Sequence, residues 1–118
     1  KELIEYLNYD MANLQVEVFK IIFLDTQNVF INEKTIVVGT IDKSYIYPRE
    51  LLKEIFEHNA KSVIFAHNHP SGNLNPSKAD INFTNSMRNL LKELEINLLD
   101  HVIIGTSGHY SFLEENLL

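Results

Sequence analysis

The chain has 118 residues, of which 45% are hydrophobic and 22% are charged, as is ordinary for globular proteins. This length allows a real hydrophobic core and predicts a single domain over residues 1–118. The net charge of −6 argues against nucleic-acid binding driven by bulk positive charge, because such domains are usually basic. The chain has no cysteine, which excludes disulfides, thiolate metal sites and a cysteine nucleophile.

The sequence gives no sign of a membrane protein. No uninterrupted apolar run approaches the length of a membrane span, and no signal peptide is visible. We therefore expect a cytoplasmic protein with no membrane partner; the sequence carries no signal for an oligomeric state. Because the chain begins at Lys1 rather than at methionine, we also expect it to be part of a longer protein.

The first third of the chain predicts a short helix and a β-hairpin. Residues 3–9 are a helix candidate, and residues 16–25 form an apolar run rich in β-branched and aromatic residues, which is typical of a strand. Residues 26–28 read as a turn into a second strand region, residues 29–40, which could be broken near residues 32–33. So short a connection predicts antiparallel pairing.

The middle of the chain predicts a helix followed by a buried strand. Pro48 suits the first turn of a helix, and residues 58–60 are expected to close it. Four hydrophobic residues recur on one face of this helix: Leu51, Leu52, Ile55 and Phe56. Residues 62–66 form a short strand candidate of the buried type.

The last third predicts a second helix and two more strands. Ser77 opens the helix, and residues 97–104 and 110–112 are strand candidates joined by a turn at residues 105–108. Hydrophobic residues recur along the helix at helical spacing: Phe83, Met87, Leu90, Leu91 and Leu94. After the first helix candidate, the order β-β-α-β-α-β-β predicts an α/β domain with a mixed sheet flanked by helices.

Two histidines follow the buried strand, separated by a single residue. In an extended segment His67 and His69 point to the same side, at the carboxyl end of a strand, where open α/β sheets tend to bind ligands. Two such imidazoles can hold a divalent metal, and Asp80 in the next helix is placed to add a carboxylate. This ligand set suits Zn²⁺, and three protein ligands leave the open position typical of catalytic zinc.

The same residues also have a structural interpretation. Ser77-x-x-Asp80 is a helix-start signature, in which the serine caps the helix and the acid is favoured by the helix dipole. Asn68, Pro70 and Gly72 are common turn formers, so the two histidines could lie on a solvated loop. On this local pattern both interpretations stay open.

The complete string from His67 to Asp80, His-x-His-Pro-x-Gly-x-x-x-Pro-Ser-x-x-Asp, resembles the metal-binding signature of the JAMM metalloproteases, also called JAB or MPN+. With Tyr-Pro-Arg-Glu at residues 47–50 and Leu-Asp-His-Val-Ile-Ile-Gly at residues 99–105, it looks like the bacterial RadC family. The likeness extends over residues 17–118. It implies a JAB/MPN-like fold, related to that of the zinc deaminases.

The resemblance also implies roles for individual residues. His67, His69 and Asp80 match the zinc ligands, and Ser77 matches the serine that helps to stabilise the oxyanion. Glu17, before the first long strand, looks like the counterpart of the family's glutamate general base. The implied activity is zinc-assisted hydrolysis of a peptide or isopeptide amide in a protein or peptide substrate.

Two alternative functions follow from the same resemblance. RadC proteins are named for DNA repair, so a metal-dependent nuclease or repair factor is possible, although only Lys61 and Lys78 lie near the motif in the sequence. The second alternative is a non-enzymatic interaction module, but the presence of the complete triad argues against it. A zinc deaminase is excluded because its site needs cysteine ligands.

Three further histidines are left after the His-x-His pair. His58 near a helix C-terminus is expected to interact with the helix dipole, and His109 is expected in a solvated turn. Asp100 and His101 interrupt an apolar strand, which costs free energy unless they are paired. They are candidates either for orienting the metal ligands or for a buried structural hydrogen bond.

Overall fold

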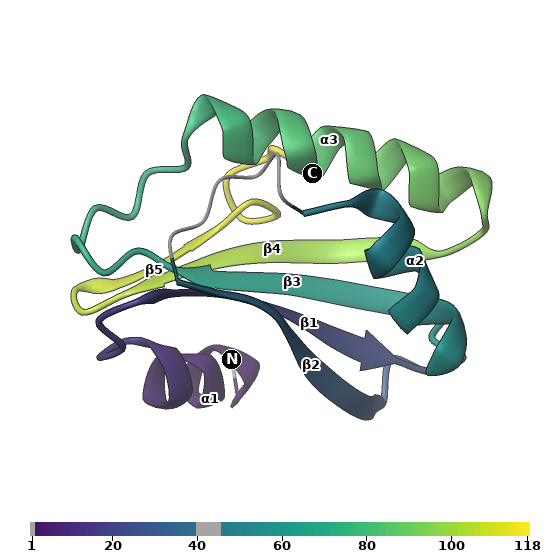
Figure 1. Ribbon diagram of the computed structural model, residues 1–118, viewed down its shortest axis with the longest axis horizontal. Coiled ribbons are helices and arrows are strands. Elements are labelled where there is room, and N and C mark those ends of the chain that lie inside the picture. The colour runs from purple at the N-terminus through teal and green to yellow at the C-terminus, as the bar shows by residue number, and fades with distance from the viewer. Residues whose placement is uncertain (1, 40–45) are drawn as a thin grey trace.

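The computed structural model describes residues 2–39 and 46–118, and within them a β-sheet is covered by helices on both faces (Figure 1). The elements in chain order are α1 (Glu2–Met11), β1 (Glu17–Leu24), β2 (Phe30–Gly39), α2 (Pro48–Glu57), β3 (Ser62–Asn68), α3 (Lys78–Glu93), β4 (Asn97–Gly105) and β5 (Gly108–Ser111). Helix α1 lies against one face of the sheet, and α2 and α3 lie over the other.

The sheet is mixed and has the strand order β2-β1-β3-β4-β5. The β3–β4 pair is parallel, with α3 as the crossover between the two strands, and the other neighbouring pairs are antiparallel. The predicted α/β class with a mixed sheet flanked by helices is therefore confirmed.

The β1–β2 hairpin contains two irregularities. Phe23 pairs with Asn32 and Leu24 pairs with Phe30, so Ile31 is an extra residue on β2; a second shift lies beside Phe19. The interruption predicted near residues 32–33 is thus wrong, because a β-bulge absorbs the irregularity without ending the strand. The end of the predicted strand, residue 40, lies outside the described residues.

Both faces of the sheet are packed, which explains why β1 and β3 read as continuous apolar runs. The cluster under α2 and α3 takes alternate residues of the central strands and the buried faces of both helices: Phe19, Ile21, Phe23, Val63, Phe65, Leu51, Ile55, Met87 and Leu91. The cluster on the side of α1 takes the buried residues of that helix and the intervening strand residues: Leu7, Met11, Val18, Ile22, Leu24, Ile64, Ala66, Val102 and Ile104.

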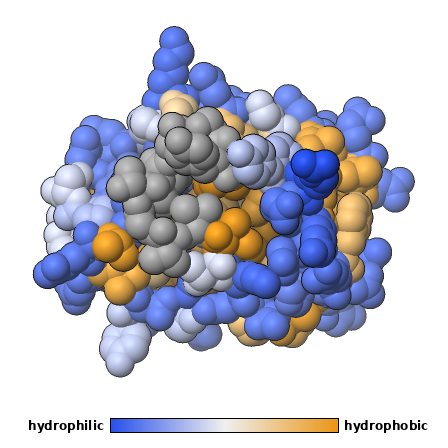
Figure 2. Space-filling view, viewed as in Figure 1, coloured by the Kyte–Doolittle hydropathy of each residue, from blue (hydrophilic) through white to orange (hydrophobic). Residues whose placement is uncertain are grey.

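Two residues predicted for the helix cores are instead on the surface. Phe56 is 56% exposed, because it follows Ile55 by about 100° around the helix and so lies on the flank of the buried face. Leu94 is 41% exposed, because it is the C-cap of α3 and lies beyond the last regular turn. On the face drawn in Figure 2, hydrophobic residues reach the surface in separate patches among hydrophilic side chains.

A partly buried ion-pair cluster attaches α1 to the sheet. Lys20 on β1 is only 4% exposed, and its ammonium donates hydrogen bonds to Asp10 of α1 and, at 2.9 Å, to Glu33 of β2. The Tyr6 hydroxyl donates to the same Glu33 carboxylate at 2.7 Å, and the Tyr6 ring centroid lies 5.4 Å from the Lys20 Nζ atom. A lysine within an apolar strand is thereby paired from two directions.

Replacing Lys20 by methionine should lower the free energy of unfolding by about 1–3 kcal/mol, because two charge-assisted hydrogen bonds are lost while the partly exposed carboxylates regain water. Burial lowers the pKa of Lys20, but the hydrogen bonds to Asp10 and Glu33 outweigh it and raise that pKa above 10.5. The contribution is therefore fully present below the unfolded-state pKa and is lost as the pH rises through the folded-state pKa.

Urea unfolding of wild type and Lys20→Met at increasing pH measures this contribution. The difference in unfolding free energy should shrink at alkaline pH. A difference that stays constant with pH would mean that packing of the lysine stem, and not its charge, is what stabilises the contact.

Candidate metal centre

The two histidines of the motif lie where β3 ends. The strand is two residues longer than predicted, because His67 pairs with Phe19 of β1 and with Ile103 of β4. His69 follows the strand, and its backbone N–H donates to the Ile104 carbonyl at 2.9 Å, which continues the alternation. Both rings therefore face the same side, as predicted.

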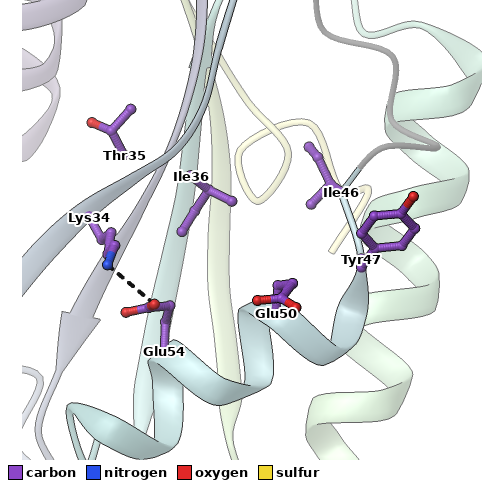
Figure 3. Close-up of a pocket in the computed structure, with 7 residues that line it drawn as sticks. All are labelled: Lys34, Thr35, Ile36, Ile46, Tyr47, Glu50 and Glu54. Carbon is purple, nitrogen blue, oxygen red and sulfur yellow. Dashed lines mark ion pairs between the residues drawn. The ribbon is translucent and has the colours of Figure 1, made fainter.

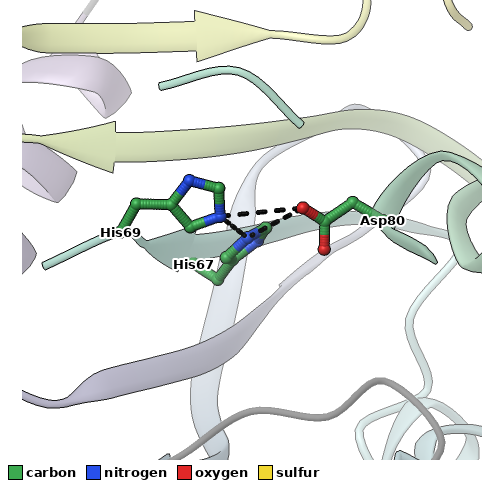
Figure 4. A group of neighbouring side chains, drawn as sticks. All are labelled: His67, His69 and Asp80. Atoms are coloured by element: carbon green, nitrogen blue, oxygen red, sulfur yellow. Dashed lines mark hydrogen bonds and ion pairs between the residues drawn. The ribbon is translucent and has the colours of Figure 1, made fainter. Parts of the chain in front are cut away.

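Asp80 completes the group from the first turn of α3, after the loop that follows β3 (Figure 4). The Nε2 atoms of His67 and His69 are 2.9 Å apart, and the Asp80 Oδ2 atom lies 3.7 Å and 3.6 Å from them. Ligand atoms at 2.0–2.1 Å from a tetrahedral ion are about 3.3 Å apart, so this group can hold a metal ion. His67 and Asp80 are buried, and His69 is partly buried, so the group lies near the surface on the side of His69.

Asn68, between the two histidines, fixes the end of the strand. Its side chain points to the opposite face and is fully buried. The side-chain carbonyl accepts from the Val18 N–H at 2.7 Å, and the amide group donates to the Val16 carbonyl at 2.9 Å. Its assignment as a simple turn former is therefore wrong: Asn68 ties the end of β3 to the start of β1.

The closeness of these side chains shifts the pKa of Asp80 and that of His69. Burial by itself would raise the pKa of Asp80, but the adjoining imidazoles of His67 and His69 outweigh it and hold that pKa far below its usual range. The Asp80 carboxylate in turn raises the pKa of His69, although burial opposes this. The carboxylate is thus held in the anionic form that a metal ligand requires.

Ser77 and Asp80 also form the helix cap that the sequence suggested. The Ser77 Oγ atom accepts from the Asp80 N–H at 3.0 Å, and Asp80 Oδ2 accepts from the Ser77 N–H at 2.9 Å. The capping interpretation and the metal interpretation are therefore compatible, because the same Oδ2 atom faces the histidines. Ser77 is exposed at the edge of the site, and its hydroxyl hydrogen can still be donated.

Glu17 is the first residue of β1 and lies on the same side of the sheet as the triad. Phe19 is the antiparallel partner of His67. Because the two strands run in opposite directions, Glu17, two residues before Phe19, lies towards His69, two residues after His67. Its side chain is partly buried, and its charge is near enough to contribute to the raised pKa of His69.

Asp100 and His101 are both hydrogen-bonded, but to different partners. Asp100 accepts hydrogen bonds from the His101 N–H at 2.7 Å, from Ser111 at 2.6 Å and from the Leu113 N–H at 3.0 Å, so it anchors the C-terminal turn. His101 is fully buried and contacts His67, with 2.8 Å between their ring nitrogens. In the sequence, this contact between His101 and His67 was indicated only by the polar pair Asp100-His101 inside an apolar strand.

The two remaining histidines lie away from the triad. The His58 ring nitrogen lies 2.8 Å from the Glu54 carbonyl in the last turn of α2, as expected of a C-terminal partner, and the ring stacks on Phe23. His109 is exposed, as expected, but it belongs to strand β5 and not to a turn, and its ring lies 3.1 Å from the Glu114 carboxylate.

A separate cavity of about 210 Å³ lies between β2 and α2 (Figure 3). Its lining combines acidic, basic and apolar side chains: Lys34, Thr35, Ile36, Ile46, Tyr47, Glu50 and Glu54. Lys34 pairs with Glu54 at 3.3 Å, so part of the negative charge is neutralised within the wall. None of the described lining residues belongs to the triad, and we assign the cavity no catalytic role.

Among the helices formed by residues 2–39 and 46–118, we find none with the length and apolar character of a membrane span.

Comparison with known proteins gives relatives over nearly the whole chain. A UPF0758 protein of Pseudoalteromonas translucida is 45% identical over 114 residues, which cover 97% of this chain and 51% of the relative. UPF0758 proteins of Vibrio cholerae and of Escherichia coli K12 (YkfG) are 45% and 42% identical, and each match covers 97% of this chain and 72% of the relative.

A Fusobacterium nucleatum relative is 43% identical to this chain. The chain spans about half the length of this relative and of the Pseudoalteromonas relative. The names of these relatives state no activity. The α/β architecture with its five-stranded mixed sheet is that expected of a JAB/MPN-like domain, and the family model described as "RadC-like JAB domain" matches residues 1–117. The chain belongs to the RadC-like JAB domain family.

Proposed function

We propose that this chain is a zinc-dependent hydrolase of the JAMM type, which cleaves a peptide or isopeptide amide in a protein or peptide substrate. The observation that carries the proposal is the convergence of His67 Nε2, His69 Nε2 and Asp80 Oδ2 at one point. Two imidazoles and a carboxylate favour zinc among the common divalent ions. We further propose that the protein acts in the cytoplasm, which suits a chain without cysteine.

The proposed chemistry divides among residues at the edge of the triad. A bound zinc ion supplies Lewis-acid chemistry, which polarises a carbonyl and lowers the pKa of water towards neutrality. Glu17 accepts a proton from the attacking water and passes it to the leaving amine. The Ser77 hydroxyl donates a hydrogen bond to the carbonyl oxygen as that oxygen gains negative charge.

The test is hydrolysis of a panel of model peptides and lysine isopeptides by zinc-loaded protein, by the same protein after chelation, and after zinc is added back. We expect cleavage that is lost with the metal and restored with it, and that is missing from His67→Ala under all three conditions. Cleavage that survives chelation, or that His67→Ala retains, would refute the zinc mechanism. A zinc-loaded protein that cleaves neither class of amide would refute the proposed reaction.

A nuclease activity is less well supported by the charges around the site. Lys61 precedes β3, at the opposite end of the strand from His67, so its proximity in sequence to the motif is misleading. Lys78, in the first turn of α3, is nearer. The complete triad likewise favours an enzyme over a purely structural interaction module.

We accordingly predict no appreciable affinity for duplex DNA at physiological ionic strength, because a phosphate-binding surface needs several cations and its affinity falls steeply with salt. Fluorescence anisotropy of a labelled duplex, measured over a range of salt concentrations, checks this. Salt-sensitive binding tighter than about 1 μM, beyond the usual non-specific range, would favour the nuclease interpretation over the protease one.

A further inference from the structure

A chain of hydrogen bonds connects two of the proposed metal ligands behind the site. His101 of β4 places its Nε2 atom 2.8 Å from His67 Nδ1 and its Nδ1 atom 2.6 Å from the Thr84 Oγ1 atom. Thr84 lies one turn after Asp80 in α3, and its hydroxyl donates to the Asp80 carbonyl at 2.7 Å. His101 and Thr84 are both fully buried, so bulk water does not compete for these bonds.

The direction of each hydrogen bond follows from this connectivity. The Thr84 hydroxyl has one hydrogen, which it gives to the Asp80 carbonyl, so it must accept from His101 Nδ1–H. A neutral His101 then has a lone pair on Nε2, which must accept from His67 Nδ1–H. The second nitrogen of His67, Nε2, is left with its lone pair directed towards His69 and Asp80.

His69 is held in the same tautomer, protonated on Nδ1, by a backbone carbonyl. Its Nδ1 atom lies 2.6 Å from the Asn73 carbonyl, which can only accept, so Nδ1 carries the hydrogen. The Nε2 lone pair is again the one that faces the cluster. A backbone carbonyl is a usual partner for a metal-binding histidine, whereas His67 uses a second imidazole in its place.

We propose that His101 and Thr84 are positioning residues, which hold His67 in the tautomer protonated on Nδ1 and so keep its Nε2 lone pair available to a metal ion. The inference rests on the metal site of the proposed function. In the other tautomer, the Nε2–H group would point at the metal position, and the metal could not bind there. The imidazole of His101 can carry out this task because it accepts on one edge and donates on the other.

The surroundings of His101 keep its ring in the orientation that this requires. Phe112 stacks on it, with ring centroids 4.6 Å apart and planes inclined by 13°. Phe19 and Phe65 meet it edge-on, at 6.0 Å and 5.9 Å. These contacts orient the ring but do not select a tautomer, because they are the same for both. The hydrogen bond to the Thr84 hydroxyl, in contrast, distinguishes the two tautomers of His101.

The Thr84 hydroxyl can be removed with little change in shape. Thr84→Val keeps the volume but removes the hydroxyl that accepts from His101 Nδ1–H, so the proton pattern of both histidines can invert. Thr84→Ser keeps the hydroxyl and is the rescue variant. Met87→Ala removes buried volume from the same helix, away from the triad, and controls for loss of stability alone.

The first measurement is nitrogen-15 NMR of the histidine rings in metal-free and zinc-loaded protein, well above the ordinary imidazole pKa of about 6.5. In wild type and Thr84→Ser we expect His67 to be protonated on Nδ1, with a scalar coupling across the hydrogen bond to His101 Nε2. In Thr84→Val this coupling should weaken or vanish. A wild type in which His67 carries its proton on Nε2 would overturn the proposal.

The second measurement is zinc affinity in competition with a chelator. Thr84→Val should bind zinc about 10–100-fold more weakly than wild type, as is typical when a partner of a metal ligand is lost. Thr84→Ser and Met87→Ala should stay close to wild type. Unchanged affinity in Thr84→Val, or an equal loss in Met87→Ala, would overturn the positioning role. Neither readout needs catalysis. A protein that binds zinc but cleaves no amide would therefore refute the proposed reaction, while the NMR and zinc-affinity results would still decide the positioning role of His101 and Thr84.

Discussion

Replacing Glu17 by glutamine should lower the rate of amide hydrolysis by about 10²–10⁴-fold, the usual effect of losing a general base. Zinc content and folding should stay at wild-type levels, because the triad of His67, His69 and Asp80 is complete without it. The amide keeps the size of the side chain but cannot take a proton from water. The expected result is thus a loaded, folded and nearly inactive protein.

The measurement compares zinc occupancy, thermal unfolding and hydrolysis of one model substrate in wild type and Glu17→Gln. Glu5→Gln is a matched control, since it makes the same change on the exposed side of α1, across the sheet from the site. Loss of zinc from Glu17→Gln would make Glu17 a ligand. Full activity with full zinc would place the general base elsewhere.

Replacing Asp80 by asparagine should act on the metal itself. We expect zinc affinity to fall by at least about 100-fold, more than the loss of an outer partner of a ligand usually costs, because the only anionic ligand becomes neutral. Folding should be largely retained: an asparagine oxygen can still accept from the Ser77 N–H and preserve the start of α3.

Zinc titration in competition with a chelator separates these effects, with circular dichroism as the check on folding. Glu93→Gln is the matched control, because it removes one negative charge at the exposed far end of the same helix. If Asp80→Asn binds zinc as tightly as wild type, the carboxylate is not a ligand. If Glu93→Gln loses as much affinity, the effect is one of general charge.

The sequence was informative where the pattern of residues is local. The His67-x-His69 spacing predicted two rings on one side of an extended segment, and their Nε2 atoms do meet at 2.9 Å. The position of Asp80 in the first turn of the following helix was enough to place a carboxylate beside them. These inferences needed only strand and helix geometry.

Other features depend on packing between distant segments. The contact of His101 with His67 and Thr84 joins β4, β3 and α3, and no local pattern specifies it. Similarly, the exposure of Phe56 depends on which part of α2 meets the sheet, not on helical periodicity alone. The sequence could mark His101 as unusual in an apolar strand, but its partners required the fold.

The central claim is that His67, His69 and Asp80 hold one zinc ion. Elemental analysis of protein purified without added metal or chelator, followed by titration with zinc, tests it most directly. We predict about one zinc per chain in wild type, as for a single three-ligand site, and none above background when His67 and His69 are both replaced by alanine. A stoichiometric metal that persists in the double variant, or a wild type that fails to bind zinc on titration, would contradict the account.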